Sequence, residues 1–298
     1  MQVFLERLFD GITNGSVYAT MALALVMVFR GTGTINFAQG EMALITTYMA
    51  WGLTSKHVPV ALALLTAAAA GFVLGAATER VLIRPIEKRG LLATLIVLLG
   101  VFTALNAVDG LIWGQTTHSL ASLFPNRLSD YLSVGGARLY FANLGVWLLA
   151  TVLVGALFAL FDRTRIGLLM RATANNRASA DLCGVRTGRI LMLGWGLAAA
   201  IGSVAGVLVT PLTPDSLGLG EMFPIFIYAS AAALFGGLDS PVGAVVGGLV
   251  IGILEVMVSG YVHAVGGQLQ EAIAFAVIVA VLLFRPQGIF GSTQLERV

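Results

Sequence analysis

The stretch that decides the architecture is Asp162–Arg189, which contains Arg171-Ala-Thr-Ala-Asn-Asn-Arg177-Ala-Ser-Ala-Asp181-Leu-Cys-Gly184-Val-Arg186. It is a polar, arginine-rich interruption between two apolar segments, Leu139–Phe161 and Ile190–Val209. Apolar helices explain residence in a bilayer, but they do not explain a long polar segment held between two spans. A segment of this kind is what a membrane subunit needs if a soluble protein must grip it and move it.

The composition points to a membrane protein along the whole chain. Hydrophobic residues make up 58% of the 298 residues and charged residues only 11%. Soluble domains carry about 25% charged residues, so this chain lacks the charge to cover a water-facing surface. We find no linker and no polar block large enough for a soluble domain. We therefore expect one transmembrane domain over residues 1–298, with a cytoplasmic loop at 162–190 inside it.

The chain divides into apolar segments of helical length. Two of them, Ile35–Leu53 and Met222–Leu238, are marginal, because a helix needs about 20 residues to cross ~30 Å of hydrocarbon. Sequence also leaves open whether 241–260 crosses completely. We predict an all-α polytopic membrane protein with about 8–10 spanning or partly spanning helices. The nine segments are Phe9–Phe29, Ile35–Leu53, Pro59–Ile83, Leu91–Trp113, Leu139–Phe161, Ile190–Val209, Met222–Leu238, Pro241–Gly260 and Leu269–Phe284.

Lysine and arginine set the predicted orientation. They gather in Glu79–Arg89, in Asp162–Arg189 and in the tail at Arg285 and Arg297, all on one side if the intervening segments cross. The positive-inside rule makes that side cytoplasmic and places Gly114–Arg138 outside. If every segment crosses, the first helix starts outside; if Ile35–Leu53 only dips into the membrane, it starts inside.

Charged side chains within the spans need a reason, because a carboxylate at a helix centre costs roughly 2.5–3.5 kcal/mol. Glu255 lies in the middle of its segment, and we expect an interhelical hydrogen bond for it. Asp109 lies near the outer end of its span, where we expect water to reach it. The candidates for pathway or structural roles are Asn14, Tyr18, Asn36, Gln39, Glu41, Asn106, Asp109 and Glu255.

Gly31–Glu41 has two interpretations. Asn36 and Gln39 have the spacing of a capping box, which predicts a helix starting at Phe37. The same geometry could instead aim the positive end of a broken helix at a cavity. Glu41 would then line a path or bond a neighbouring helix, and we favour the structural role.

Glycine and proline mark a turn and several close contacts. In Gly236-Gly237-Leu-Asp-Ser240-Pro241, Pro241 suits the first turn of a helix and Asp239 or Ser240 its cap. The interpretations are a tight turn or a gating hinge. Small residues four apart let helices approach closely, either within the chain or at a subunit interface. Such pairs are Gly71/Gly75, Gly202/Gly206, Gly243/Gly247 and Gly248/Gly252.

Motifs for catalysis are missing from the sequence. The only lysines, Lys56 and Lys88, do not belong to a phosphate-binding G-x-x-x-x-G-K-[ST] loop. No serine sits in G-x-S-x-G, and the three histidines are scattered. We expect a subunit without enzymatic activity, cofactor or metal. The basic residues follow the topogenic pattern, so we infer no nucleic-acid binding.

The arginine-rich segment could be an ordinary topogenic loop, but its alanines favour helix and Gly184 is a plausible stop. We predict a short surface helix of about two to three turns, a lever that could sit in a groove of an ATPase. Cys183, the single cysteine, excludes an internal disulfide, and we interpret it as a small apolar filler. The predicted coupling residues are Arg171, Ala172, Asn175, Asn176, Arg177, Asp181, Gly184 and Arg186.

Four blocks along the whole chain resemble the first permease subunit of branched-chain amino-acid ABC importers. Near the beginning they are Gly11-Ile-Thr-Asn-Gly15-Ser-Val-Tyr18-Ala-Thr and Ile35-Asn-Phe-Ala-Gln39-Gly40-Glu41. The arginine-rich block, Arg171 to Val185, resembles the coupling loop of that family. The last block comprises Gly236-Gly237-Leu-Asp-Ser240-Pro241-Val-Gly243 and Arg285-Pro-Gln-Gly288-Ile. One departure is Gln39, where the family often has histidine.

The resemblance implies half of a membrane channel in a bacterial inner membrane. A second homologous permease subunit would complete it, two cytoplasmic ABC ATPases would drive it, and an extracytoplasmic binding protein would deliver an amino acid. Relatives also carry urea or short amides. The alternative is an ion-coupled carrier or channel that uses Glu41, Asp109 or Glu255 as coupling groups.

Overall fold

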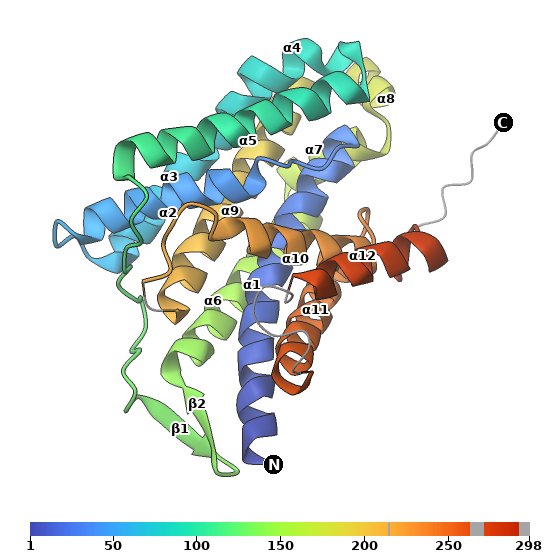
Figure 1. Cartoon of the computed structure of the whole chain (residues 1–298). Coiled ribbons are helices and arrows are strands. Elements are labelled where there is room, and N and C mark those ends of the chain that lie inside the picture. Colours follow the sequence, from blue (N-terminus) through green and yellow to red (C-terminus); the bar gives the residue numbers. More distant parts are fainter. Residues whose placement is uncertain (214, 263–270, 292–298) are drawn as a thin grey trace.

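The computed structural model describes residues 1–213, 215–262 and 271–291, and it confirms an all-α polytopic architecture (Figure 1). Within this part of the chain, six helical spans are long and apolar enough to cross a membrane. They are α1 (Gln2–Thr32), Val60–Ile86, α5 (Leu91–Trp113), α6 (Phe141–Arg163), Thr187–Leu212 and α11 (Pro241–Tyr261).

Two of these spans are composite. Val60–Ile86 is α3 (Val60–Thr78), the π-helical turn η1 (Glu79–Ile83) and α4 (Arg84–Ile86), and the 3₁₀ turn η2 (Glu87–Arg89) follows. Thr187–Leu212 is α9 (Thr187–Val209) with the 3₁₀ turn η3 (Thr210–Leu212). The shorter membrane helices are α2 (Gln39–Thr54), α10 (Met222–Gly236) and α12 (Ala272–Phe284).

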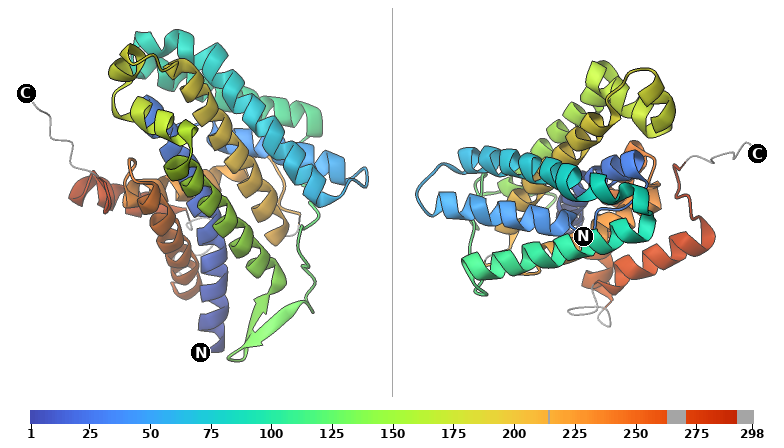
Figure 2. Two further views of the ribbon diagram at one scale, coloured as in Figure 1. Left: turned by 180° about the vertical axis from the view of Figure 1, so that it is seen from behind. Right: turned by 90° about the horizontal axis from the view of Figure 1, so that it is seen from above.

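The arginine-rich segment and the connection 114–140 lie at opposite ends of the molecule (Figures 1 and 2). The connection contains a hairpin, β1 (Tyr131–Val134) paired antiparallel with β2 (Ala137–Tyr140). The beginning of α1 is fastened to this hairpin, because the Arg138 backbone N–H donates to Glu6 at 3.2 Å. The opposite end of α1 reaches α7 (Arg165–Asn175). Of the predicted cation groups, Glu79–Arg89 and Asp162–Arg189 lie at the same end, joined by Arg177 and Glu87, while Arg297 lies outside the described residues. The span predicted from Leu139 begins as helix only at Phe141.

The helices form a buried centre and an exposed periphery. In the most apolar window of each span, 78% of the residues are buried in α1 and 72% in α9, against 22% in α3 and 17% in α5. The peripheral helices present apolar side chains such as Leu92 and Leu111 outward. Those faces suit lipid or another membrane subunit, whereas α1 and α9 hold the chain together.

Glycines make the tight contacts between central helices. A Cβ placed on Gly252 of α11 would lie 2.2 Å from the backbone N of Gly15 in α1, and one on Gly248 would lie 2.3 Å from Ala19. A Cβ on Gly75 would lie 2.4 Å from the carbonyl O of Trp195 in α9. Since these contacts lie within the chain, the predicted small-residue pairs act in internal packing.

The helices α2 and α10 begin in the interior of the bundle. The Gln39 side chain, at the start of α2, donates to the Ala198 carbonyl in the middle of α9 at 2.8 Å. A Cβ on Gly40 would lie 3.3 Å from the carbonyl O of Met222, the first residue of α10, so the two helix starts touch. With 16 and 15 residues they extend about 24 and 22 Å, less than the ~30 Å of hydrocarbon.

The last predicted span is shorter than expected. Leu269 and Gln270 lie outside the described residues, and α12 has 13 residues, about 20 Å. Its apolar composition alone suggested a longer crossing than the helix provides.

Candidate functional site

The arginine-rich segment forms two helices and not the single surface helix that the sequence predicts. α7 ends at Asn175, and α8 (Arg177–Leu182) begins directly afterwards. The break follows from Asn176, whose side chain leaves the helix and accepts the Ser179 backbone N–H at 2.9 Å as an N-cap. Gly184 ends α8 as predicted, with φ of +82°.

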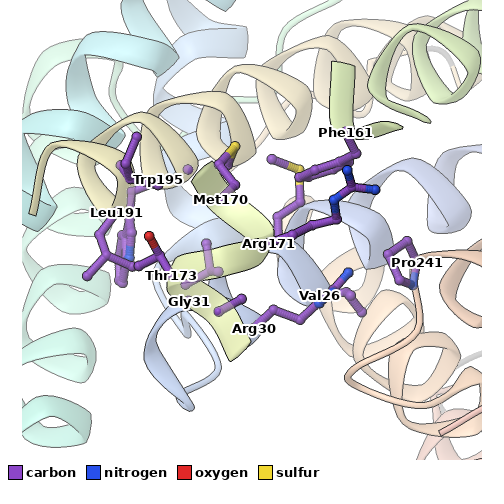
Figure 3. A pocket seen from close by; sticks show the side chains of 15 residues that line it. Val26, Arg30, Gly31, Phe161, Met170, Arg171, Thr173, Leu191, Trp195 and Pro241 are labelled. Carbon is purple, nitrogen blue, oxygen red and sulfur yellow. The ribbon is translucent and has the colours of Figure 1, made fainter. Parts of the chain in front are cut away.

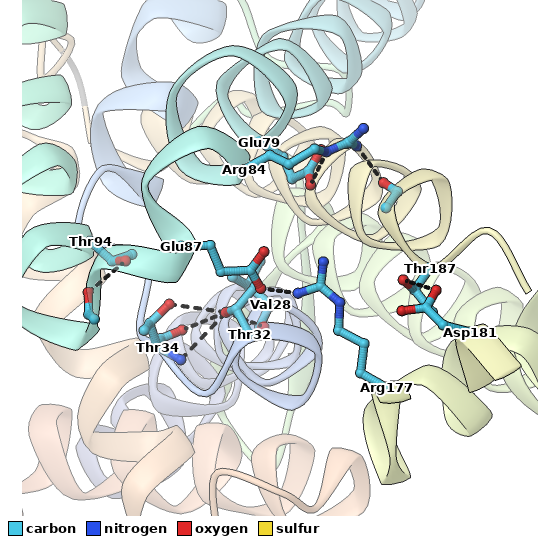
Figure 4. A network of polar contacts seen from close by, with 12 residues as sticks. Val28, Thr32, Thr34, Glu79, Arg84, Glu87, Thr94, Arg177, Asp181 and Thr187 are labelled. Atoms are coloured by element: carbon cyan, nitrogen blue, oxygen red, sulfur yellow. Dashed lines mark hydrogen bonds and ion pairs between the residues drawn. The ribbon is translucent and has the colours of Figure 1, made fainter. Parts of the chain in front are cut away.

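Three side-chain links tie together the helix ends around the arginine-rich segment (Figure 4). Arg177 of α8 forms an ion pair with Glu87, just before α5. Asp181, also in α8, accepts the Thr187 hydroxyl at 2.7 Å, at the first residue of α9. Arg84 binds Glu79 at 2.6 Å and donates to the Gly188 carbonyl. Movement of α8 would therefore reach α3, α5 and α9.

The remaining predicted coupling residues lie mostly on the outer surface of this segment. Arg171 pairs with Asp162 at 3.0 Å. Leu182 is 89% exposed and is the most exposed large apolar side chain of α8. Cys183 is exposed, so its interpretation as a filler is wrong. The other exposed residues are Ala172, Asn175, Asn176, Gly184 and Arg186.

A small cavity of about 40 Å³ lies between α1, α7 and α9 (Figure 3). Its walls are mostly apolar, and they carry Arg30 and Arg171. The beginning of α7 is packed tightly, because a Cβ on Gly167 would lie 2.3 Å from the Leu160 carbonyl O. α7 is thus fixed at the α6 junction and borders empty space further along.

Three predicted polar residues meet between α1 and α11, and we call them the Glu255 cluster: Asn14, Tyr18 and Glu255. Tyr18 donates its hydroxyl hydrogen to Glu255 at 2.8 Å, and the Asn14 amide donates to the same oxygen at 3.4 Å. Tyr18 also stacks on Tyr228 of α10, with ring centroids 5.1 Å apart. The interhelical hydrogen bond predicted for Glu255 is present.

A second group, the Asp109 cluster, joins α2 and α5 through Glu41, Tyr48, Asn106 and Asp109. The Asn106 amide donates to Glu41 at 3.3 Å, so Glu41 bonds a side chain of the neighbouring helix. Asp109 is fully buried, which contradicts the prediction that water reaches it. Neither Asp109 oxygen, nor the Tyr48 hydroxyl, finds a hydrogen bond among the described residues.

The capping box predicted at Asn36 and Gln39 is not formed. α2 begins at Gln39 and not at Phe37, and Asn36 accepts the Ala38 backbone N–H at 3.1 Å. The Asn36 amide also donates to the Gln39 side chain at 3.1 Å. The two side chains brace the interior start of α2.

The connection between α10 and α11 is a tight turn, which is one of the two interpretations of its sequence; the other was a gating hinge. Ser240 caps α11 by accepting the Gly243 backbone N–H at 3.0 Å, with Pro241 as the first helical residue. Gly237 has φ of +109°, and a Cβ there would lie 2.7 Å from the Gly291 backbone N. A Cβ on Gly236 would lie 2.0 Å from the Gly243 carbonyl O.

Several residues of these sites escaped sequence reasoning. Glu87 and Thr187 could have been suspected from their place beside the arginine-rich segment, but nothing in the sequence pairs them with α8. The sequence does not mark Tyr48 as a site residue, because a tyrosine is common in an apolar helix. Among the described residues, no group of three or more His, Cys, Asp or Glu is arranged to hold a metal ion.

Fold and site together define a polytopic membrane protein with an arginine-rich segment linked to its helices. A family model described as "Branched-chain amino acid transport system / permease component" matches residues 7–282. The chain belongs to this family.

Individual relatives match nearly the whole chain. The chain is 30% identical to the high-affinity branched-chain amino acid transport system permease protein LivH of Escherichia coli, over 99% of this chain and 98% of that protein. It is 31% identical to the corresponding permease protein BraD of Pseudomonas aeruginosa, with the same coverage. The ribose import permease protein RbsC of Escherichia coli is 26% identical over 84% of this chain and 77% of that protein. No solved structure matches the chain.

Proposed function

We propose that this chain is the membrane-spanning permease subunit of an ATP-driven importer of branched-chain or related amino acids. All 298 residues would form one permease domain, with residues 162–190 as its cytoplasmic coupling loop. The observation that carries the proposal is α8, whose outer surface is exposed while Arg177 and Asp181 fasten it to the membrane helices. Such an element suits a motor protein that binds from the cytoplasm. The names of the relatives support the substrate class.

The contacts of α9 support a path for this movement. α8 is linked to the first turn of α9, and the middle of α9 is bonded to α2 through Gln39 and Ala198. One turn further, Thr46 of α2 donates to Ser203 of α9 at 2.9 Å. A pull on α8 would therefore shift α9 and, with it, the interior start of α2.

The remaining parts would come from other chains. A second homologous permease subunit would cover exposed apolar faces, two ABC ATPases would bind at the cytoplasmic end, and an extracytoplasmic binding protein would deliver the substrate. ATP binding would close the ATPases and switch the pathway, and hydrolysis would reset it, so that this chain itself performs no catalysis. We place the assembly in a bacterial inner membrane.

The docking surface is tested by Leu182→Asp. Leu182 is 89% exposed, so the substitution removes little internal packing and places a charge where the ATPase would bind. We expect loss of copurifying ATPase in mild detergent and loss of uptake, with normal membrane insertion. Leu132→Asp is the matched control, because Leu132 is 45% exposed on the hairpin at the opposite end. Equal ATPase recovery in both variants would remove α8 from the docking surface.

The transmission path is tested by reversing the Arg177–Glu87 ion pair. Arg177→Glu alone places two carboxylates together, and we expect ATPase binding without uptake. Arg177→Glu with Glu87→Arg restores opposite charges, so uptake should recover at least in part. If the double variant stays as inactive as the single one while both are inserted, the pair does not transmit the movement. The stronger disruption, Arg177→Glu with Asp181→Arg, cuts two links and should abolish uptake.

The unpartnered carboxyl of Asp109 favours a second candidate, an ion-coupled carrier. The two functions differ in their energy source. Uptake by the purified chain in ATP-free vesicles under an ion gradient would establish the carrier; uptake that needs internal ATP and the copurified ATPases establishes the importer.

A further inference from the structure

A cavity with several polar and charged side chains in its walls opens at the hairpin end of the molecule, opposite α7 and α8. Its volume is about 560 Å³, and small-molecule sites commonly occupy about 300–1,000 Å³. Residues from α1, α6, the connection 126–128 and the end of η3 surround it. The lining includes Asp10, Asn14, Arg127, Tyr140, Asn143 and Thr213.

Internal hydrogen bonds hold the walls of this cavity. Asn126 donates to the Pro211 carbonyl at 2.8 Å and thereby fastens the connection to η3. Asn143, which is 6% exposed, donates to one carboxylate oxygen of Asp10 at 3.3 Å. Trp147 donates to Thr13 at 2.9 Å behind the same wall. The cavity is therefore a built part of the fold.

The cavity contains charges of both signs. Asp10 supplies a carboxylate and Arg127 a guanidinium, and neither belongs to an ion pair found among the described residues. An arginine binds a carboxylate through two parallel hydrogen bonds, and a carboxylate accepts from an ammonium group. A zwitterionic α-amino acid carries both groups, so its charges are complementary to this pair.

Polar side chains continue inward from the cavity along one face of α1. Asp10, Asn14 and Tyr18 are spaced four residues apart, so they lie above one another on the helix. Asn14 belongs both to the cavity wall and to the Glu255 cluster. A polar line thus joins the mouth of the cavity to the buried carboxylate of Glu255.

We propose that this cavity is the entry site for a zwitterionic amino acid, with Asp10 holding its ammonium group and Arg127 its carboxylate. The proposal rests on the proposed function and adds the place and the chemistry of substrate entry. From this site the ammonium group moves along α1 toward Glu255. An uncharged amide or urea would gain little from either charge.

The test uses the complex purified through a tag on this chain and reconstituted in proteoliposomes with its binding protein. The probes are radiolabelled leucine and, in parallel, urea. Asp10→Asn and Arg127→Gln should each lower leucine uptake about tenfold, because each removes one ion pair with the substrate. The recovery of copurified ATPase should not change. The matched controls are Asp215→Asn and Lys56→Gln, which remove exposed charges on the same side outside the cavity.

The outcomes separate this proposal from the proposed function. Leucine uptake by the wild type with equal uptake in all four variants would refute the entry site and leave the importer intact. Uptake of urea alone would reject both the ligand class and the proposed substrate. If Asp10→Asn fails to assemble, Thr213→Cys in a Cys183→Ser background takes its place in the test. Leucine should slow the labelling of the new cysteine by a membrane-impermeant maleimide. An unchanged labelling rate would overturn the proposal.

Discussion

Glu255 and Asp109 are both carboxylates buried among membrane helices, and their surroundings differ sharply. Glu255 is 4% exposed and accepts hydrogen bonds from Tyr18 and Asn14. Asp109 is fully buried without a hydrogen bond among the described residues. The first carboxylate holds helices together. The second lowers the stability of the chain, because a buried polar group without a partner keeps its full desolvation cost.

The difference shows that depth in the membrane does not define the role of a polar residue. Glu255 is placed by backbone contacts between α1 and α11, which bring its donors within reach. Asp109 lies near Tyr48, whose ring stacks on that of Trp113 with centroids 5.1 Å apart, and it accepts no hydrogen bond among the described residues. Stability and function can therefore be separated by substitutions in the two clusters.

The largest expected effect comes from a methyl group added at the helix contact of the Glu255 cluster. In Gly252→Ala the new Cβ would lie 2.2 Å from the Gly15 backbone N, which cannot move aside without separating α1 from α11. We expect the free energy of unfolding to fall by about 3 kcal/mol, from overpacking and weakened hydrogen bonds to Glu255.

Gly110→Ala is the matched change beside Asp109. Its Cβ would lie 3.2 Å from the tip of the flexible Leu219 side chain, so we expect less than about 1 kcal/mol. Unfolding in mixed detergent micelles measures both. Similar losses in the free energy of unfolding would show that the Glu255 and Asp109 clusters are packed alike, and the contrast between them would not hold.

Glu255→Leu should have the next largest effect. It removes the acceptor of two interhelical hydrogen bonds, and such bonds contribute about 0.6–1.7 kcal/mol each in membrane proteins. We expect a loss of about 1–3 kcal/mol in the same unfolding assay. Glu255→Gln keeps an acceptor and should lose clearly less; equal losses in both would mean that the charge, and not the hydrogen bonds, stabilises this position.

Asp109→Leu should act in the opposite direction. An apolar side chain of similar size removes an unpartnered carboxyl, so the free energy of unfolding should stay constant or rise by about 1 kcal/mol. Unfolding of the isolated chain measures this, and Asn106→Leu, which removes the donor to Glu41, serves as the contrasting variant that should lose stability. A loss as large as that of Glu255→Leu would show that Asp109 stabilises the fold.

The apolar segments could be predicted from the sequence because hydrophobicity adds up locally along a helix. The break at Asn176 could not be predicted, because the neighbouring alanines favour one continuous helix and a single asparagine side chain interrupts it by bonding to the backbone. The burial of Asp109 was missed for another reason. The chain folds back over the end of α5, where His118 and Leu217 exchange backbone hydrogen bonds at 2.8 and 3.2 Å, and the sequence gives no sign of that pairing.

For the candidate sites too, the sequence predicts individual residues but not the contacts between distant parts of the chain. Asn14, Tyr18 and Glu255 were identified singly, because polar residues in apolar segments are visible without a structure. Their meeting depends on α1 and α11 lying side by side, 237 positions apart at Tyr18 and Glu255. The ion pair of Arg177 with Glu87 is likewise a product of the three-dimensional arrangement.

The smallest expected effect concerns Gln39, where the family often carries histidine. Gln39 donates to the Ala198 carbonyl at 2.8 Å and accepts from Asn36 at 3.1 Å. A neutral histidine also has one donor and one acceptor, but its rigid ring reaches less far, so Gln39→His should lose less than about 1 kcal/mol. Gln39→Leu removes both bonds and should lose about 1–2 kcal/mol. Comparing leucine uptake with stability decides the role of this position: parallel changes make Gln39 a brace for α2, whereas lost uptake at wild-type stability in Gln39→His would place it in the transport pathway beside the Glu255 cluster.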